Sequence, residues 1–88
     1  MVRRRLVIHG RVQGVFFRDT LRTLAERYGV AGWARNTPYG TVETVLEVDD
    51  DALARVSAFA REGPEGARVE RVDEHAEEPQ GLSGFSIR

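Results

Sequence analysis

A strand, a glycine-containing loop and a helix follow one another in residues 5–29, which read RLVIHGRVQGVFFRDTLRTLAERYG. Apolar and polar side chains alternate over residues 5–12, and this period of two predicts a β-strand. Residues 13–17, with Gly14 in their middle, interrupt the alternation. Apolar residues then recur at the spacing of one helix face, namely Leu21, Leu24, Ala25 and Tyr28. Gly29 stands where helices commonly end, so this stretch predicts a helix that stops at residue 28 or 29.

The middle of the chain predicts a hairpin followed by a second helix. Strands are expected over residues 30–36 and 41–48, joined by the turn sequence Thr-Pro-Tyr-Gly. Three consecutive Asp at residues 49–51 supply cap oxygens and negative charge for a helix start, which we favour over a metal site. The expected buried stripe of this helix consists of Leu53, Val56, Phe59 and Ala60. Gly63-Pro64 is expected to end it.

The last part of the chain predicts two further strands. Residues 68–76 have strand character, but Val69 and Val72 fall on opposite faces, so we expect a bulge. A loop over residues 77–84 leads to a short strand with Phe85 and Ile87 on one side. The whole order predicts a single domain over residues 1–88 of the α+β class. The expected arrangement is a ferredoxin-like βαββαβ sandwich, an antiparallel sheet with both helices on one face. This topology hosts enzymes, RNA binders and metal carriers, so it does not decide function.

Composition excludes several kinds of chemistry. All 13 basic residues of the 88 are Arg, and there is no Cys or Lys, which excludes disulfides, thiolate sites, Schiff bases and a P-loop lysine. Residues 1–44 hold eight Arg and three acidic residues, whereas residues 45–88 hold five Arg and eleven acidic residues. An anion site is therefore favoured in the first half, although ordinary surface charge is the alternative. The surplus of Arg and the single Asn fit either a heat-stable protein or a biased gene composition. No signal peptide or membrane span is visible, so a cytoplasmic protein is expected.

Two short segments carry residues suited to phosphate chemistry. A loop around Gly14 that enters a helix N-terminus presents unbonded backbone N–H groups, and the helix dipole favours an anion there. Arg18 follows this loop with a planar fork of donors that can grip the same anion; a tight turn with a surface Arg is the alternative. Asn36, at the end of the second predicted strand, is either a turn residue or a carboxamide that holds a water in line with phosphorus.

Together these segments resemble the two signatures of the acylphosphatase family. The first matches from Ile8 through Arg18 and the second from Gly32 to Val42. The matching positions are Gly10, Val12, Gln13, Gly14, Val15, Phe17 and Arg18 in the first, and Trp33, Asn36, Gly40 and Val42 in the second. The remaining chain agrees in pattern, except that Val48 stands where the family usually has Gly. This departure bears on the connection to the second helix rather than on the site.

The resemblance implies hydrolysis of acyl phosphates to a carboxylate and inorganic phosphate, without a metal or cofactor. By analogy with the family, Arg18 grips the phosphoryl group together with loop amides, and Asn36 orients the attacking water. The phosphate-binding residues implied are Gln13, Gly14, Val15, Phe16, Phe17 and Arg18. We expect a monomer that acts on a small acyl phosphate and binds neither nucleic acid nor a membrane.

Other candidate sites are less well supported by the sequence. His9 and His75 are isolated histidines, and no serine has a recognisable base beside it. Phe16, Phe17 and Trp33 are expected to be core residues or pocket walls rather than an RNA-stacking surface, and the net charge of −1 argues against a nucleic-acid footprint. The alternatives that remain are a non-catalytic phosphate- or carbamoyl-phosphate-binding module and, less favoured, a nucleic-acid-binding domain.

Overall fold

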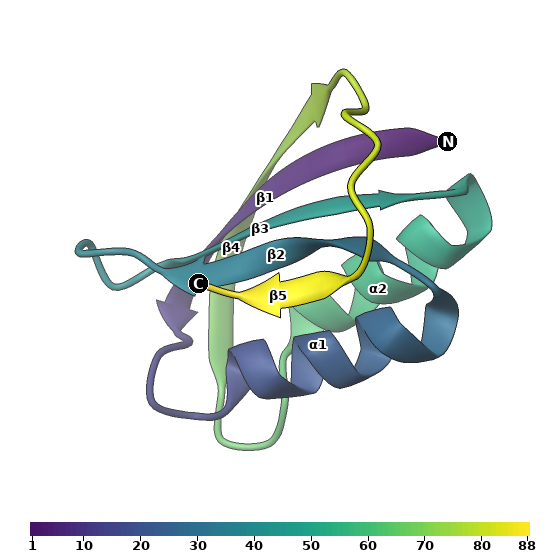
Figure 1. Ribbon diagram of the computed structural model, residues 1–88. Coiled ribbons are helices and arrows are strands. Elements are labelled where there is room, and N and C mark those ends of the chain that lie inside the picture. The colour runs from purple at the N-terminus through teal and green to yellow at the C-terminus, as the bar shows by residue number, and fades with distance from the viewer.

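The computed structural model describes residues 1–88 as a five-stranded sheet with two helices packed on one face (Figure 1). In chain order the elements are β1 (Val2–Arg11), α1 (Phe17–Tyr28), β2 (Ala31–Asn36), β3 (Val42–Val48), α2 (Asp50–Glu62), β4 (Arg68–Glu77) and β5 (Phe85–Ile87). The strand order across the sheet is β4-β1-β3-β2-β5. The predicted ferredoxin-like βαββαβ arrangement is confirmed. Neither helix has the length and apolar composition that crossing a membrane requires.

The sheet is mixed at one edge. Strands β4, β1, β3 and β2 pair antiparallel, as predicted, whereas β5 pairs parallel with β2, placing Ile87 opposite Ala34. Residues 78–84 carry the chain from β4 across the other side of the sheet to this far edge (Figure 1). The final strand therefore lies beside the strand that ends at Asn36.

The predicted bulge in β4 is present where it faces the end of β1. Pairing shifts between His9 and Gly10, which leaves Glu70 without a partner across the ladder. Gly10 has φ +126°, and a Cβ there would lie 2.0 Å from the carbonyl oxygen of Arg68. Only glycine permits this close approach of the two strands. The bulge thus bends the sheet where β1 passes into the loop that precedes α1.

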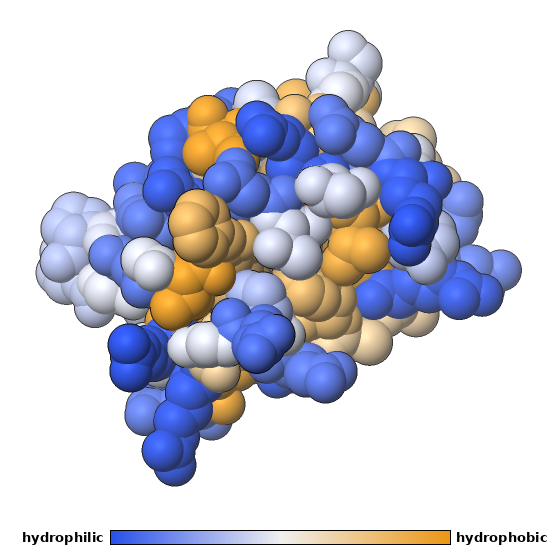
Figure 2. All heavy atoms as spheres, turned by 90° about the horizontal axis from the view of Figure 1, so that it is seen from below, coloured by the Kyte–Doolittle hydropathy of each residue, from blue (hydrophilic) through white to orange (hydrophobic).

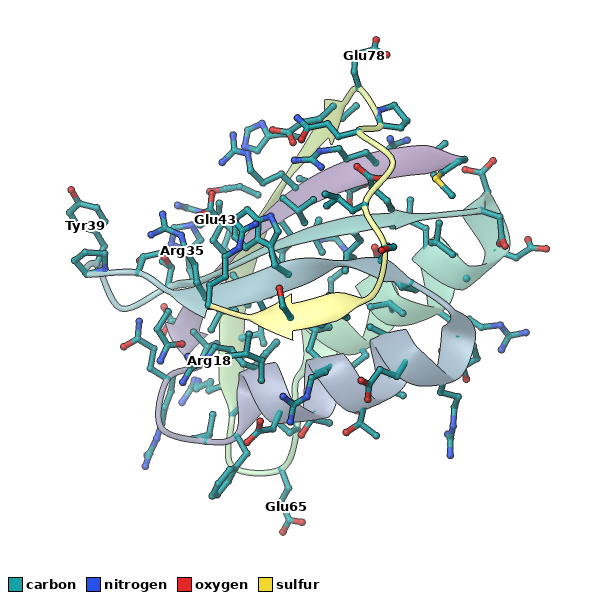
Figure 3. The ribbon with its side chains drawn as sticks, in the orientation of Figure 1. Arg18, Arg35, Tyr39, Glu43, Glu65 and Glu78 are labelled. Atoms are coloured by element: carbon teal, nitrogen blue, oxygen red, sulfur yellow. The ribbon has the colours of Figure 1, made fainter.

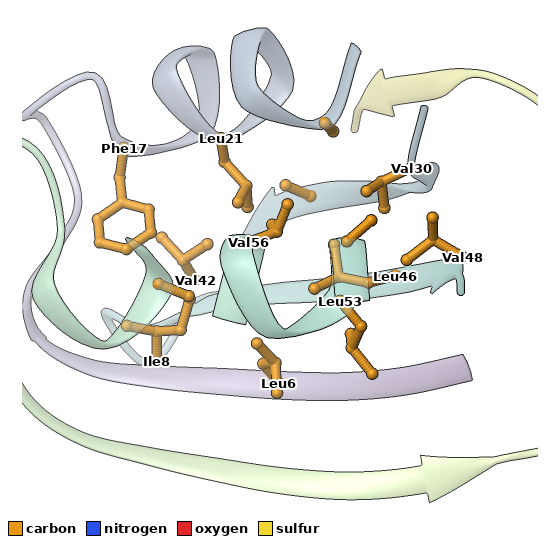
Figure 4. Packing of buried hydrophobic residues seen from close by; sticks show 14 of the residues in the cluster. Leu6, Ile8, Phe17, Leu21, Val30, Val42, Leu46, Val48, Leu53 and Val56 are labelled. Atoms are coloured by element: carbon orange, nitrogen blue, oxygen red, sulfur yellow. The ribbon is translucent and has the colours of Figure 1, made fainter. Parts of the chain in front are cut away.

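The hydrophobic core lies between the helices and the sheet (Figure 4). Its fully buried side chains include Leu6, Ile8, Phe17, Leu21, Leu46 and Val56. The outward surface of the helices is largely hydrophilic, with separated apolar areas (Figure 2). Tyr28 was predicted to lie on the buried face of α1, but it is 36% exposed in the last turn of the helix and lies under the guanidinium of Arg55. Burying the remaining stripes fixes α1 and α2 against the sheet.

Val48, at the position where the family usually has Gly, fits into the connection between β3 and α2. Val48 is the last residue of β3 and is 5% exposed within the core cluster. Asp49 follows it as the N-cap of α2, and its carboxylate accepts a hydrogen bond from the backbone N–H of Ala52 at 3.0 Å. The predicted role of the Asp run as a helix cap is confirmed.

Candidate active site

The loop between β1 and α1 presents a concave set of backbone N–H groups. Gly14 (φ +75°) and Phe16 (φ +60°, ψ +27°) both adopt left-handed conformations, and α1 begins immediately after Phe16. None of the backbone N–H groups from Gly14 to Arg18 donates to an acceptor within the protein. Alternating left-handed residues turn successive N–H groups toward one point, and the N-terminus of a helix adds positive potential there. The geometry of this loop is therefore suited to an anion.

Arg18 lies in the first turn of α1 beside this loop. It lines a pocket of about 290 Å³ whose other walls are Val12, Gly14, Phe16, Phe17, Asp19, Asn36 and Ile87. Arg18 forms neither an ion pair nor a hydrogen bond with any side chain. Its neighbour Asp19 instead faces Arg22 at 3.5 Å. Figure 3 shows Arg18 on the helix side of the sheet, opposite to Arg35 and Glu43. The guanidinium fork of Arg18 is therefore free to bind a ligand.

Asn36 reaches the same pocket from the sheet. It is the last residue of β2, and its Oδ1 atom is buried without a hydrogen-bond partner. A buried polar atom left without a partner lowers stability by about 1–3 kcal/mol, so a hydrogen bond from a molecule bound in the pocket would stabilise this one. The pocket thus joins the partly buried Arg18 and the carboxamide of Asn36, as the sequence predicts.

Gln13 has a different position from the one predicted for a phosphate ligand. Its Nε2 atom donates to the backbone carbonyls of Thr37 and Thr41, both at 2.9 Å. These bonds fasten the loop to the β2–β3 hairpin, next to Asn36. Gln13 and Val15 do not line the pocket, whereas the other predicted loop residues do. The carboxamide of Gln13 therefore sets the distance between the two halves of the site.

The sequence model of the acylphosphatase family matches residues 4–87. This chain belongs to the acylphosphatase family. An acylphosphatase of Thermococcus kodakarensis is 49% identical over 86 residues, covering 98% of this chain and 94% of the relative. An acylphosphatase of Pyrobaculum islandicum is 54% identical over 81 residues, covering 91% of this chain and 85% of the relative. The crystal structure of acylphosphatase from Bacillus subtilis superposes with a TM-score of 0.96 at 30% identity, covering 100% of this chain and 99% of that one.

As an acylphosphatase, the chain hydrolyses acyl phosphates to a carboxylate and inorganic phosphate. Its pocket combines the side chain of Arg18, backbone N–H groups of the loop without protein acceptors and the carboxamide of Asn36. Ile87 was not predicted as part of the acylphosphatase pocket. It reaches the pocket because β5 pairs parallel with β2, and the predicted short strand with Phe85 and Ile87 on one side was the only sequence signal for it.

The opposite face of this acylphosphatase sheet carries a buried network of paired charges. Glu47 is completely buried and accepts hydrogen bonds from Nη1 of Arg3 (2.7 Å) and from the backbone N–H groups of Gln80 (2.8 Å) and Leu82 (3.0 Å). Burial alone raises the pKa of Glu47, but these three donors outweigh it and lower the pKa to about 2. Arg3 also bonds Glu77 at 2.9 Å. The network holds the 78–84 segment over the sheet and was not predicted from the sequence.

Proposed function

We propose that the phosphoryl group of an acyl phosphate binds to Arg18 and to the backbone N–H groups of Gly14–Phe17, while Asn36 orients the attacking water. One observation carries this assignment: Arg18 and the buried Oδ1 of Asn36 line one pocket, and neither has a partner within the protein. Gln13 belongs to the same machinery as a positioning residue, because its hydrogen bonds join the phosphate loop to the hairpin.

The reaction requires little beyond Arg18 and the loop N–H groups, which together form a clamp on the phosphoryl group, and a positioned water. The water oxygen forms a bond to phosphorus while the bond from phosphorus to the acyl oxygen breaks, and the acyl group leaves as a carboxylate. A carboxylate is a good leaving group, so no general acid is needed, and the proton of the water passes to a phosphoryl oxygen. The transition state of phosphoryl transfer is loose, so catalysis comes mainly from positioning and from stabilising negative charge. The fork of Arg18 and the aligned N–H groups supply that stabilisation.

The residues of the pocket also favour a metal-independent reaction. Asp19 is the only carboxylate in its lining, and no group of three or more His, Cys, Asp or Glu side chains in the chain is arranged to hold a metal ion. The positive charge of Arg18 and the N–H dipoles of the loop take the role that Mg²⁺ has in many phosphoryl-transfer enzymes.

Hydrolysis of benzoyl phosphate in EDTA and ¹⁸O-water tests this assignment. We expect turnover at an undiminished rate, with the label recovered in inorganic phosphate because water attacks phosphorus. Label in benzoate would show attack at the carbonyl carbon and would contradict the role of Asn36. Binding of phosphate without turnover would favour a non-catalytic phosphate-binding module on the same fold.

We further propose that the protein acts as a heat-stable monomer in the cytoplasm, on a small acyl phosphate and without nucleic acid or membrane partners. The single Asn, the absence of Cys and the paired Arg and Glu side chains on the sheet support heat stability. Light scattering after size-exclusion chromatography tests the monomer, and a thermal unfolding midpoint below about 65 °C, within the mesophile range, would contradict the heat stability.

A further inference from the structure

The side chain of Phe16 is the most exposed apolar group of the active-site loop. It is 78% exposed, whereas its neighbour Phe17 is 2% exposed and packs against Phe59 with ring centroids 5.6 Å apart. Val15, on the other side, packs against the core. Phe16 neither belongs to the core cluster nor packs against it. Its ring therefore contributes little to folding.

The backbone of Phe16 is also strained. It is the only non-glycine residue with a positive φ in the chain, at +60°. Gly and Asn adopt this left-handed conformation at lower cost than a bulky residue does. The loop needs the conformation, but it does not need a phenyl ring there. A residue that is costly at its position and unused in the core points to a contact with a ligand.

The ring stands at the pocket that holds the phosphoryl group. Phe16 and Ile87 are the pocket's apolar walls that keep accessible surface, since Val12 and Phe17 are almost fully buried. In-line displacement places the leaving acyl group on the side of phosphorus opposite the attacking water. With the water at Asn36 on the sheet, the acyl group extends away from the sheet and past the loop that carries Phe16.

We propose that Phe16 forms the acyl-group subsite and gives the enzyme a preference for acyl phosphates with aromatic or bulky apolar acyl groups. This inference rests on the proposed binding of the phosphoryl group by Arg18 and the loop. The ring packs against the acyl group in the ground state and the transition state alike, so it acts mainly on KM. An acetyl group is too small to use this surface fully.

The test compares benzoyl phosphate with acetyl phosphate as substrates of Phe16→Asn. Asn tolerates the left-handed conformation, so this change removes the ring and keeps the loop. We expect kcat/KM for benzoyl phosphate to fall roughly tenfold, through KM, and kcat/KM for acetyl phosphate to fall less than about threefold. Phe16→Leu restores part of the benzoyl preference. Tyr39→Asn is the matched control, because Tyr39 is 90% exposed at the hairpin tip, away from Arg18 (Figure 3).

Inhibition by inorganic phosphate separates the subsite from the loop. Phosphate lacks an acyl group, so its inhibition constant should change less than twofold in Phe16→Asn. Equal losses for both substrates, or a weakened phosphate inhibition, would assign Phe16 to loop geometry and overturn the subsite. An unchanged benzoyl preference would also overturn it. Failure of the proposed phosphoryl site would give a different result, in which substitution of Arg18 leaves the hydrolysis of both substrates unchanged.

Discussion

Arg3 and Arg18 are both arginines at least partly withdrawn from solvent, and they lie on opposite faces of the same sheet. Arg3 is 7% exposed and bonds two carboxylates, Glu47 at 2.7 Å and Glu77 at 2.9 Å. Arg18 faces the pocket on the helix side without a carboxylate partner. A charge removed from water normally acquires a partner within the protein, as Arg3 does.

The difference separates charged and polar groups that bond to other parts of the protein from groups that we propose to bind the phosphoryl group and the attacking water. On the face of the sheet away from the helices (the open face), Glu47 accepts three hydrogen bonds, two of which hold the 78–84 segment in place. In the pocket, Arg18, the loop N–H groups and the Oδ1 of Asn36 are left unpaired within the protein. Substitutions in the two regions should therefore affect different measurements.

Arg18→Lys should have the largest effect. A point charge cannot reproduce the fork, so we expect kcat/KM for benzoyl phosphate to fall about 10³-fold. The free energy of unfolding should change by less than about 0.5 kcal/mol, because Arg18 has no protein partner to lose. Arg22→Lys, one turn along the exposed side of α1, is the matched control. A near-normal rate in Arg18→Lys would remove Arg18 from the clamp.

Asn36→Ala should lower kcat roughly 10²–10³-fold, as for the loss of one positioned group in a transition state. Inorganic phosphate should still inhibit at a similar concentration, because the loop and Arg18 are intact. The free energy of unfolding should not fall by more than about 0.5 kcal/mol, since the Oδ1 atom has no partner in the protein. Weaker phosphate binding at an unchanged rate would contradict the water-positioning role.

Glu47→Gln should act on stability instead of rate. Removing the charge opposite Arg3 is expected to lower the free energy of unfolding by about 3 kcal/mol at pH 7 in urea denaturation. The kcat of the folded protein should remain within about twofold of the wild type, because Glu47 lies on the face away from the pocket. Glu65→Gln, an exposed carboxyl without an ion pair, controls for charge alone (Figure 3). A large loss of kcat in folded Glu47→Gln would break the separation of the two faces.

The pH dependence of stability follows from the ion pair between Arg3 and Glu47. The pKa of Glu47 is about 2, below its ordinary value of 4.5, so the folded state favours the ionised carboxylate. This stabilisation is complete above about pH 4.5 and is lost as the pH falls toward about 2. Arg3 and Arg5 lower the pKa of Glu77 in the same direction. Between pH 5 and pH 2, wild-type stability should fall more steeply than that of Glu47→Gln; parallel curves would contradict the assignment.

Gln13→Ala should have the smallest effect. It removes two hydrogen bonds to the hairpin, with a net contribution of about 1 kcal/mol each. We expect a rate loss of roughly tenfold that falls on kcat, because the displaced loop no longer aligns phosphorus with the water. The conservative variant Gln13→Glu should not restore the rate, since a carboxylate cannot donate to two carbonyls. Loss of stability at a normal kcat would reduce Gln13 to a structural role.

Local patterns were sufficient to predict the helices and strands and to select the two segments that the structure brings together at one pocket. The period of two over residues 5–12, the helix face that includes Leu21 and Ala25, the stop at Gly29 and the cap at Asp49 each depend on neighbours in sequence. The loop from Gly14 to Arg18 was recognisable for the same reason, because its chemistry lies in consecutive residues.

Contacts that depend on strand register could not be predicted. Arg3 meets Glu47 because β1 and β3 pair with those residues opposite one another, and a segment more than 30 residues further on buries the pair. Gln13 bonds backbone carbonyls, which every residue has, so no side-chain type at Thr37 or Thr41 signals the contact. Ile87 enters the pocket only through the parallel pairing of β5.

Titration of the ¹⁵N-labelled protein with inorganic phosphate, followed by ¹⁵N–¹H correlation spectra, tests the central claim most directly. The backbone N–H signals of Gly14 through Arg18 and the side-chain NH₂ of Asn36, the only Asn, should shift together along one binding curve. The N–H signals of Gln80 and Leu82, already bonded to Glu47, should stay in place. Shifts centred on the open face, or an unmoved loop at saturating phosphate, would contradict the assignment of the unpaired pocket as the phosphoryl site.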